Sequence, residues 1–205
     1  AYAPYYCIDF DAWGADVIGV DLGQIGGPQI AALVFRDSAM FNRLSIDPLR
    51  LAGLGLAPGL AGGVSAVVDH LASLVPAPEG RSTRRTRLVA SMGELSSYLR
   101  SLRDDLYTFL GTWPAVHILG ATGEAAAEAS TERLPRLTFG VQGVPAATVY
   151  ERLFDNGIVT TLATPTPLLT DMGLEEMGGA VTVGLGPFNT YADIEQLIRV
   201  VASLA

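Results

Sequence analysis

The sequence predicts an α/β protein in which a layer of strands and helices is followed by a second unit of α+β type. Three observations predict this class. Two apolar runs at 15–21 and 29–35 flank a glycine-rich break, apolar residues recur at helical spacing over 83–110, and short strands then alternate with helices to the last residue. We place the domain boundary after residue 85. This gives a first domain over 1–85 and a second over 86–205 that begins with the long helix.

The first predicted domain opens with two strands. The run at 15–21 is expected to be a buried strand, and a second strand at 29–35 follows a break at Gly26-Gly27-Pro28. Asp37 or Ser38 can then cap a short helix that continues to residue 44. The predicted order is therefore strand, glycine-rich loop, strand and helix.

The uncharged stretch at 51–68 is long enough to be considered as a membrane span. Five glycines and Pro58 interrupt it, so we predict instead a glycine-rich connection that enters a buried helix carrying Val64, Val68 and Leu71. The first six residues contain neither a basic segment nor a continuous apolar run, which argues against a secretory signal. No membrane association is predicted, and a cytoplasmic location is expected.

The longest predicted helix spans about 83–110, and Gly111 and Pro114 end it. Its apolar residues step by three and four, with arginines and acidic residues on the other face. These apolar residues are Leu88, Met92, Leu95, Leu99, Leu102, Leu106 and Leu110.

The second domain is predicted from short strands and two capped helices. Gly157 stops the first of these helices, at 145–156. Thr190 and Asp193 form a capping box for the second, which carries Ile194, Leu197, Ile198, Val201 and Leu204 on one face. A solvated loop is expected at 120–130. The expected strands are 116–119, 137–141, 158–161 and 180–185.

Composition excludes several functions. The 13 basic residues are all arginine, and no lysine occurs in the chain, so no lysine amine is available for chemistry. The 21 acidic residues give a net charge of −8, which disfavours nucleic acid and anionic membranes as partners. The single Cys7 excludes an intrachain disulfide and any cysteine-rich metal site. We predict no metal.

No catalytic residue is predicted from motifs. His70 and His117 lie in no recognisable hydrolytic motif, and packing roles are favoured for both. The glycine-rich loop at 23–28 lies between two strands rather than between a strand and a helix, so tight turns are favoured over phosphate binding. A basic cluster can hold a phosphate or an acidic partner, but a solvated loop entering the long helix is favoured. Its members are Arg81, Arg84, Arg85 and Arg87.

Three segments together resemble a known family. Residues 15–37, with strand, Gly-Pro turn and a second strand ending in Arg36, resemble the segment around the cofactor lysine of class V aminotransferases and cysteine desulfurases. Residues 155–159 resemble the family's "Leu-x-x-x-Gly-Ile" step. Residues 179–190 resemble its "Val-Arg-Ile-Ser-Leu-x-x-Tyr-Asn-Thr" strand and helix cap. The three occur in family order, which is more specific than any one alone.

The resemblance implies the fold-type I architecture of pyridoxal-phosphate enzymes, a large α/β domain followed by a small α+β domain. This chain would be the C-terminal part of the large domain followed by the small domain. Pyridoxal phosphate is implied as cofactor by the resemblance only, and family members are commonly homodimers. A homo-oligomer or a missing N-terminal half is therefore the expected partner. A mean hydropathy of +0.35 fits uncovered apolar surface.

The departures from the family are chemical. Counting back from Gly26, the position of the cofactor lysine falls on Gly23, in the loop that continues through Gln24, Gly26, Gly27 and Pro28. The position of the family's substrate-carboxylate arginine falls on Thr182. With neither group present, covalent cofactor binding through lysine is impossible, and a non-catalytic protein is expected. The competing hypothesis is a non-enzymatic α+β module for dimerisation or ligand binding.

Overall fold

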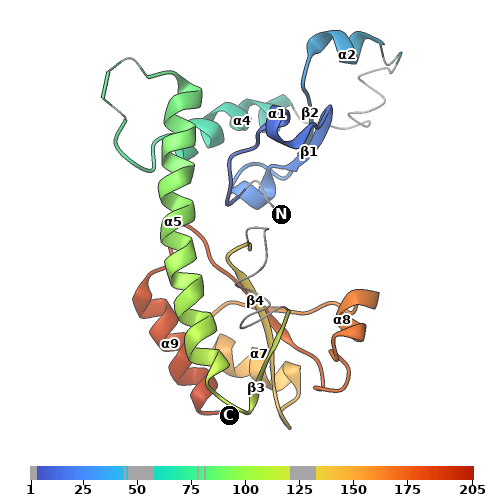
Figure 1. Cartoon of the computed structure of the whole chain (residues 1–205), viewed down its shortest axis with the longest axis vertical. Coiled ribbons are helices and arrows are strands. Elements are labelled where there is room, and N and C mark those ends of the chain that lie inside the picture. The colour runs from blue at the N-terminus through green and yellow to red at the C-terminus, as the bar shows by residue number, and fades with distance from the viewer. Residues whose placement is uncertain (1–3, 44, 46–57, 78, 81, 121–132) are drawn as a thin grey trace. The chain divides into compact units, whose positions relative to one another are not determined.

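The computed structural model describes residues 4–43, 45, 58–77, 79–80, 82–120 and 133–205. The chain divides into two compact units, Ala1–Ser96 (unit 1) and Ser97–Ala205 (unit 2). Each unit has its own antiparallel sheet (Figure 1). The division falls inside the long helix α5, Arg84–Gly111. The sequence-based domain boundary after residue 85 stays a prediction.

Unit 1 is a two-stranded hairpin with helices around it (Figure 1). The strands β1 and β2 pair antiparallel in the register Val17↔Phe35 to Asp21↔Ala31. The two runs predicted as strands are therefore confirmed as strands. The elements are α1 (Phe10–Trp13), β1 (Val17–Asp21), the 3₁₀ helix η1 (Gly23–Ile25), β2 (Ala31–Phe35), α2 (Ser38–Arg43), α4 (Pro58–Leu71) and the first part of α5.

Local hydrogen bonds fix the ends of these elements. The carboxylate of Asp9 accepts hydrogen bonds from the backbone N–H groups of Asp11 and Ala12 and so caps α1, a helix that the sequence analysis did not predict. Arg36 donates to the carbonyls of Phe10 and Ala15, which ties the end of β2 to α1. In α2, Asp37 accepts from the backbone N–H of Ala39, as predicted for a cap.

The predicted burial of unit 1 is wrong. Residues of β1 alternate between exposed and half-buried, and no residue of α4 is buried. An apolar run shows that a segment can be buried, but burial also needs a second surface to pack against it, and the described part of unit 1 supplies little. Helix α4 also begins earlier than predicted. Pro58 starts it, so Gly59, Gly62 and Gly63 are helical.

Unit 2 is a four-stranded antiparallel sheet with the strand order β3-β4-β6-β5. Helix α7 contacts α9 and the strands β4, β5 and β6. The predicted helices and most of the predicted strands are present. The elements are the second part of α5, β3 (Val116–Leu119), β4 (Arg136–Val141), α7 (Ala146–Asp155), β5 (Thr161–Leu162), α8 (Pro167–Asp171), β6 (Val181–Gly184) and α9 (Tyr191–Ala202).

The core of unit 2 lies on one face of this sheet. Leu137, Phe139 and Val141 of β4 are at most 2% exposed, and Val181 and Val183 of β6 lie on the same side. The apolar stripes predicted for the helices face this core. Buried helical residues are Leu99, Leu102, Leu106 and Leu110 of α5, Val149 and Leu153 of α7, and Ile194, Leu197, Val200 and Val201 of α9.

Two elements of unit 2 differ from the prediction. The strand expected at 158–161 is Thr161–Leu162 instead, because Gly157 has a positive φ of 76° and Ile158 N–H bonds back to the carbonyl of Leu153. The residues that follow α7 form a turn, and the chain pairs with β6 only from Thr161 onward. Helix α8 was not predicted, although Thr166 caps it ahead of Pro167.

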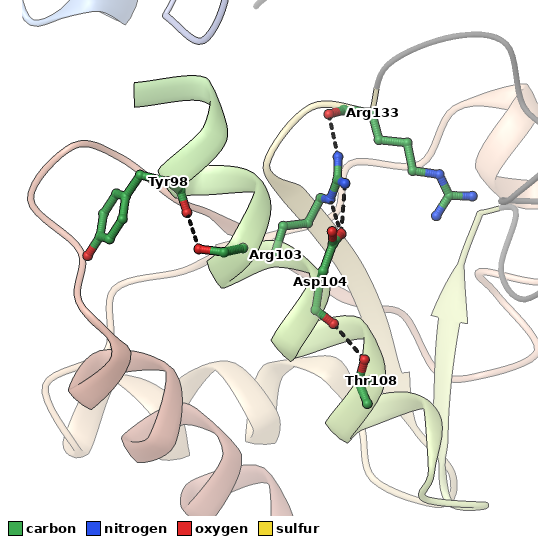
Figure 2. A network of polar contacts seen from close by, with 6 residues as sticks. Tyr98, Arg103, Asp104, Thr108 and Arg133 are labelled. Carbon is green, nitrogen blue, oxygen red and sulfur yellow. Dashed lines mark hydrogen bonds and ion pairs between the residues drawn. The ribbon is translucent and has the colours of Figure 1, made fainter. Parts of the chain in front are cut away.

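A polar network fixes the chain just before β4 (Figure 2). The Arg103 guanidinium is held by Asp104 Oδ1 through Nε at 2.9 Å and Nη2 at 2.7 Å. Its Nη1 donates to the carbonyl of Arg133 at 2.8 Å. The Arg133 guanidinium in turn lies over the ring of Tyr107, 5.2 Å from the ring centroid. The network therefore anchors the start of β4 to α5.

The α/β class predicted from the sequence is confirmed. None of the helices among the described residues combines the length and the apolar character that a membrane crossing needs. Some sequence-based predictions lie outside the described residues: the end of the short helix at residue 44, the stretch 51–57, Arg81 and the loop from 121 onward.

Candidate functional site

The loop that the resemblance marks as the cofactor-lysine segment is a compact turn between β1 and β2. Gly23 starts η1, and the Asp21 carboxylate accepts a hydrogen bond from the Gly23 backbone N–H at 3.0 Å. Gly26 ends the turn with φ = 80°, a conformation that favours glycine. Gly27 N–H closes it onto the carbonyl of Leu22 at 2.8 Å. Gln24 is exposed at the tip.

The backbone conformation at position 23 does not require glycine. Gly23 does not have a positive φ, so a side chain is sterically allowed there. A Cβ on Gly23 would meet the amide of Gln29, with both Oε1 and Nε2 at 2.9 Å. The Gln29 side chain, which the sequence analysis did not single out, thus occupies the space that a residue-23 side chain would enter. Gln29 is exposed, and its amide can move away.

Gly27 differs from Gly23, because a Cβ there would lie 2.8 Å from the backbone oxygen of Leu22 and 3.0 Å from Cγ2 of Val67. The backbone oxygen cannot rotate away. On the other side of the turn, a Cβ on Gly63 of α4 would lie 3.4 Å from Cγ of Pro28. Close approach between this loop and α4 therefore explains Gly27, as the tight-turn interpretation predicted.

An apolar cavity of about 230 Å³ lies within unit 1. Its polar groups are Cys7, Arg85 and the hydroxyl of Tyr6, and the rest of its wall is aliphatic. Burial raises the pKa of the Cys7 thiol, while the charge of Arg85 opposes this shift. A thiol with a raised pKa is mostly protonated at neutral pH and is a poor nucleophile. Aliphatic wall residues include Val20, Leu22, Val34, Val64, Val68 and Leu88.

Two arginines of the basic cluster, Arg84 and Arg85, make contacts inside unit 1 rather than lying in a free solvated loop. Arg84 Nε contacts Asp69 Oδ1 at 2.7 Å, and Nη2 of Arg84 donates to Ser65. Arg85 Nη2 donates to the carbonyl of Ile8 at 2.9 Å. The hydrogen bond from Arg84 lowers the pKa of Asp69. These arginines therefore tie the start of α5 to α4 and to the N-terminal segment.

Thr182, the position of the family's substrate-carboxylate arginine, lies in β6 of unit 2. It is paired with Thr138 of β4 and Thr161 of β5, and its Oγ1 lies 2.9 Å from Oγ1 of Thr138. These residues and Arg136 line one pocket. Gly23 and Thr182 belong to different units. Sequence analysis missed Arg136, since only the strand register brings it near Thr182.

The histidines lie in the predicted elements. His70 is in the last turn of α4 and His117 is in β3, and both are exposed. Among the described residues, no group of three or more His, Cys, Asp or Glu side chains is placed to hold a metal ion.

Comparison with curated proteins shows a relative that matches the whole chain. The chain is 38% identical over 213 residues to an uncharacterised protein of Mycobacterium tuberculosis (strain CDC 1551 / Oshkosh). The match covers all of this chain and 51% of that protein, so the chain spans about half the length of its relative. No protein-family model matches the chain.

Solved structures establish the fold. The apo cysteine desulfurase of Thermococcus onnurineus NA1 superposes with a TM-score of 0.69 at 16% identity, covering 99% of this chain and 50% of that one. A NifS-like protein of Rickettsia africae ESF-5 gives 0.57 at 20% identity, covering 98% and 50%. The cysteine desulfurase CsdA of Escherichia coli gives 0.55 at 15% identity, covering 98% and 49%. The chain therefore has the cysteine desulfurase fold over half the length of those proteins.

The residues present do not fit a covalently held pyridoxal phosphate. The fold implies that cofactor, but the sequence contains no lysine. The space beside Gly23 is occupied by the amide of Gln29, which is neutral and cannot replace an amine.

Proposed function

We propose that this chain is the C-terminal half of a cysteine desulfurase-like protein that has lost the covalent chemistry of its fold and works by binding rather than catalysis. One observation carries the proposal: the loop at the lysine position has Gly23, with the Gln29 amide beside it, in a chain without lysine. The backbone at Gly23 tolerates a side chain, so the fold does not forbid a lysine there.

The loss at Thr182 supports the same proposal. A threonine hydroxyl cannot form the bidentate, charge-assisted contact that arginine makes with a substrate carboxylate. The raised pKa of Cys7 also supports it, because the only thiol in the chain is held mostly in its unreactive form. The lysine and the arginine are thus missing from the two positions that the resemblance assigns to them, and the single thiol of the chain is not activated.

The test is a titration of the purified chain with pyridoxal phosphate, followed by borohydride reduction and peptide mapping. We expect no internal residue to be labelled and no release of sulfide or alanine from cysteine. The chain terminus carries the only primary amine, so it is blocked beforehand by reductive methylation. An internal label, or turnover of cysteine above the rate with free cofactor, would overturn the proposal.

Two lysine variants sharpen this test. Gly23→Lys puts an amine at the position assigned to the family lysine, and Gln24→Lys puts one on the exposed neighbour. If the loop retains cofactor-binding geometry, the first variant is labelled at a lower cofactor concentration than the second. Equal labelling would show that no such geometry is left in the isolated chain.

We also propose that unit 1 is covered by further protein, either the part of the polypeptide that this chain lacks or a second copy. Support comes from the exposed apolar residues of the hairpin, among them Val17 at 41%, Leu33 at 53% and Val34 at 41%. Sedimentation analysis tests the second copy. We expect a dimer or larger species that Leu33→Glu dissociates. A monomer for the unaltered chain would leave the missing polypeptide as the covering partner.

The non-enzymatic dimerisation or ligand-binding module remains the second candidate. The same exposed hairpin favours it, because that surface is independent of any cofactor. A stable dimer that binds no pyridoxal phosphate at any concentration would favour this candidate over a retained cofactor pocket.

A further inference from the structure

A groove of about 280 Å³ lies between helices α5 and α9 of unit 2. Asp105 and Phe109 line it from α5, and they lie on the same face of that helix because they are four residues apart. Tyr191 lines it from α9, and the aliphatic part of its wall comes from Ile194, which is buried, and Ile198, which is half-buried. This α5–α9 groove therefore combines aromatic, aliphatic and acidic side chains.

The aromatic side chains of the groove are exposed, and Tyr191 is held in place. Its hydroxyl lies 2.9 Å from Oγ of Ser101, and its ring meets the ring of Tyr98 edge-on, with the centroids 6.4 Å apart. The Tyr98 hydroxyl donates to the carbonyl of Asn189 at 2.7 Å. Tyr191 is nevertheless 49% exposed, and Phe109 is 51% exposed. An aromatic ring that is already fixed loses little conformational entropy when a partner covers it.

The two carboxylates of the groove differ in their partners. Oε2 of Glu195 lies 3.7 Å from Nη1 of Arg199, one turn later in α9. Asp105 is half-buried, and its carboxylate makes no hydrogen bond or ion pair with another residue that the structure describes. Its neighbour in the sequence, Asp104, instead holds the guanidinium of Arg103 (Figure 2). Asp105 therefore gives the groove a negative charge that a cation from outside can balance.

The exposed aromatic surface extends beyond the groove along α5. Tyr98, which is 36% exposed, precedes Phe109 by eleven residues, or three helical turns, so both lie on one face of the helix. The distance along the helix axis is about 16 Å. A free molecule of amino-acid size is shorter than this, whereas about five residues of an extended peptide span it. Tyrosine and phenylalanine are also enriched at protein interfaces. The surface therefore fits a peptide segment better than a small molecule.

We propose that the α5–α9 groove docks a peptide segment of a partner protein in which an arginine stands beside an apolar residue. The guanidinium binds the Asp105 carboxylate and stacks on the rings of Phe109 and Tyr191. A planar, weakly hydrated guanidinium is better suited to aromatic faces than the strongly hydrated ammonium of lysine. The apolar residue packs on Ile198. The net charge of −8 favours encounter with a basic partner.

The test is a titration of the ¹⁵N-labelled full chain with the blocked peptide acetyl-Ala-Leu-Arg-Leu-Ala-amide, followed by two-dimensional NMR. We expect saturable shifts of the backbone amides of Asp105, Phe109, Tyr191 and Glu195. The same peptide with citrulline, the neutral analogue of arginine, should bind at least fivefold more weakly, and the peptide with lysine should bind with intermediate affinity. Equal binding of the arginine and citrulline peptides, or no saturable shift at these amides, would overturn the proposal.

Two further measurements identify the occupant of the groove. N-acetyl-L-argininamide, a free molecule with the same single positive charge, should bind at least fivefold more weakly than the arginine peptide. Equal binding would overturn the assignment of a peptide segment. Dilution of the chain without peptide should leave the four groove amides unshifted. Shifts of these amides on dilution, together with a dimer in sedimentation, would place a second copy in the groove and so overturn the proposal.

Variants identify the carboxylate and the ring. Asp105→Asn should weaken binding of the arginine peptide at least fivefold and abolish its advantage over the citrulline peptide. Phe109→Ser should weaken binding of both peptides. Glu151→Gln, at an exposed carboxylate of α7 outside the groove, should leave binding within twofold. Equal weakening by Asp105→Asn and Glu151→Gln would show general charge attraction only and reject the site. Neither Gly23 nor Thr182 lines the groove, so failure here leaves the proposed function untouched.

Discussion

Units 1 and 2 are both rich in apolar residues, but they bury very different numbers of them. In the described part of unit 1 the buried apolar residues are Leu22, Ala72, Met92 and Leu95, whereas unit 2 buries whole faces of β4, β6, α7 and α9. The hairpin of unit 1 instead exposes Leu33 at 53%, and Leu60 of α4 is 40% exposed. The apolar pattern therefore sets which surface can be buried, while the presence of a facing layer decides whether it is buried.

The two units also differ in how far each can form a binding site without further protein. Unit 2 contains a sheet with a finished core on one face and a polar pocket on the other, so it can present a binding site by itself. Unit 1 holds the loop at the lysine position on a hairpin whose strand residues are all exposed or half-buried. A binding function therefore depends less on further protein in unit 2 than in unit 1.

The largest expected contrast is between core truncations in the two units. Phe139→Ala in β4, where the side chain is 0% exposed, should cost about 3–5 kcal/mol of unfolding free energy, because it opens a cavity. Leu33→Ala in β2 should change it by less than about 0.5 kcal/mol. Urea unfolding measures both, with Trp113 reporting on unit 2 in a Trp13→Phe background and Trp13 reporting on unit 1 in a Trp113→Phe background. Similar losses of unfolding free energy for the two variants would contradict the difference in burial between the two units.

A pair of glycines sharpens the comparison within unit 1. Gly27→Ala should destabilise this unit by about 1–3 kcal/mol, since its Cβ would lie 2.8 Å from the carbonyl oxygen of Leu22. Gly62→Ala should stabilise it by about 0.5–1 kcal/mol, because this helical position has no heavy atom within 4 Å. Thermal unfolding followed by Trp13 fluorescence gives both values. A stable Gly27→Ala variant would show that the loop and α4 are not packed closely.

Removing a helix cap tests unit 2 more gently. Asp193 Oδ2 accepts a hydrogen bond from the Thr190 backbone N–H at 2.8 Å at the start of α9. Asp193→Ala should cost about 0.5–1 kcal/mol, through this bond and the favourable charge at the helix N-terminus. Urea unfolding of unit 2 measures it, with the exposed Glu195→Ala as the control. A cost no larger than that of the control would show that the Asp193 cap does not stabilise unit 2.

The smallest expected effect is on acid stability, and it belongs to unit 1. The pKa of Asp69 is lowered by its hydrogen bond from Arg84, so the ionised form is favoured in the folded state. The resulting stability is present above the unfolded value of 3.8 and is lost as the pH falls through the lower folded pKa. Asp69→Asn should flatten the pH dependence of Trp13 fluorescence between about pH 5 and about pH 2. Asp171→Asn in unit 2 is the control, and an equal effect of both would contradict the assignment.

Elements whose signals lie within a few residues could be predicted from the sequence. Gly157 as a stop and Thr190 with Asp193 as a cap are local features, and the stripe of α5 repeats over the whole helix. The burial of β1 could not be predicted correctly, because it depends on what covers the hairpin. The short β5 depends on where the chain first reaches β6 after Gly157, which no local pattern encodes.

The sites divide in the same way. Gly23 and Thr182 were identified by counting along the motifs of the family that the sequence resembles. Gln29 beside Gly23, and Arg136 diagonal to Thr182, come from a turn and a strand register that the motifs do not contain.

The most direct test of the central claim, that unit 2 has a complete core and unit 1 does not, is hydrogen exchange of the intact chain. The measurement is made by mass spectrometry at a concentration at which sedimentation shows a monomer. We predict that the amides of β4 and β6 exchange only through global unfolding, while those of β1 and β2 exchange orders of magnitude faster. Equal protection of the two sheets would contradict the account, since it would mean that unit 1 is held as firmly as unit 2 without further protein.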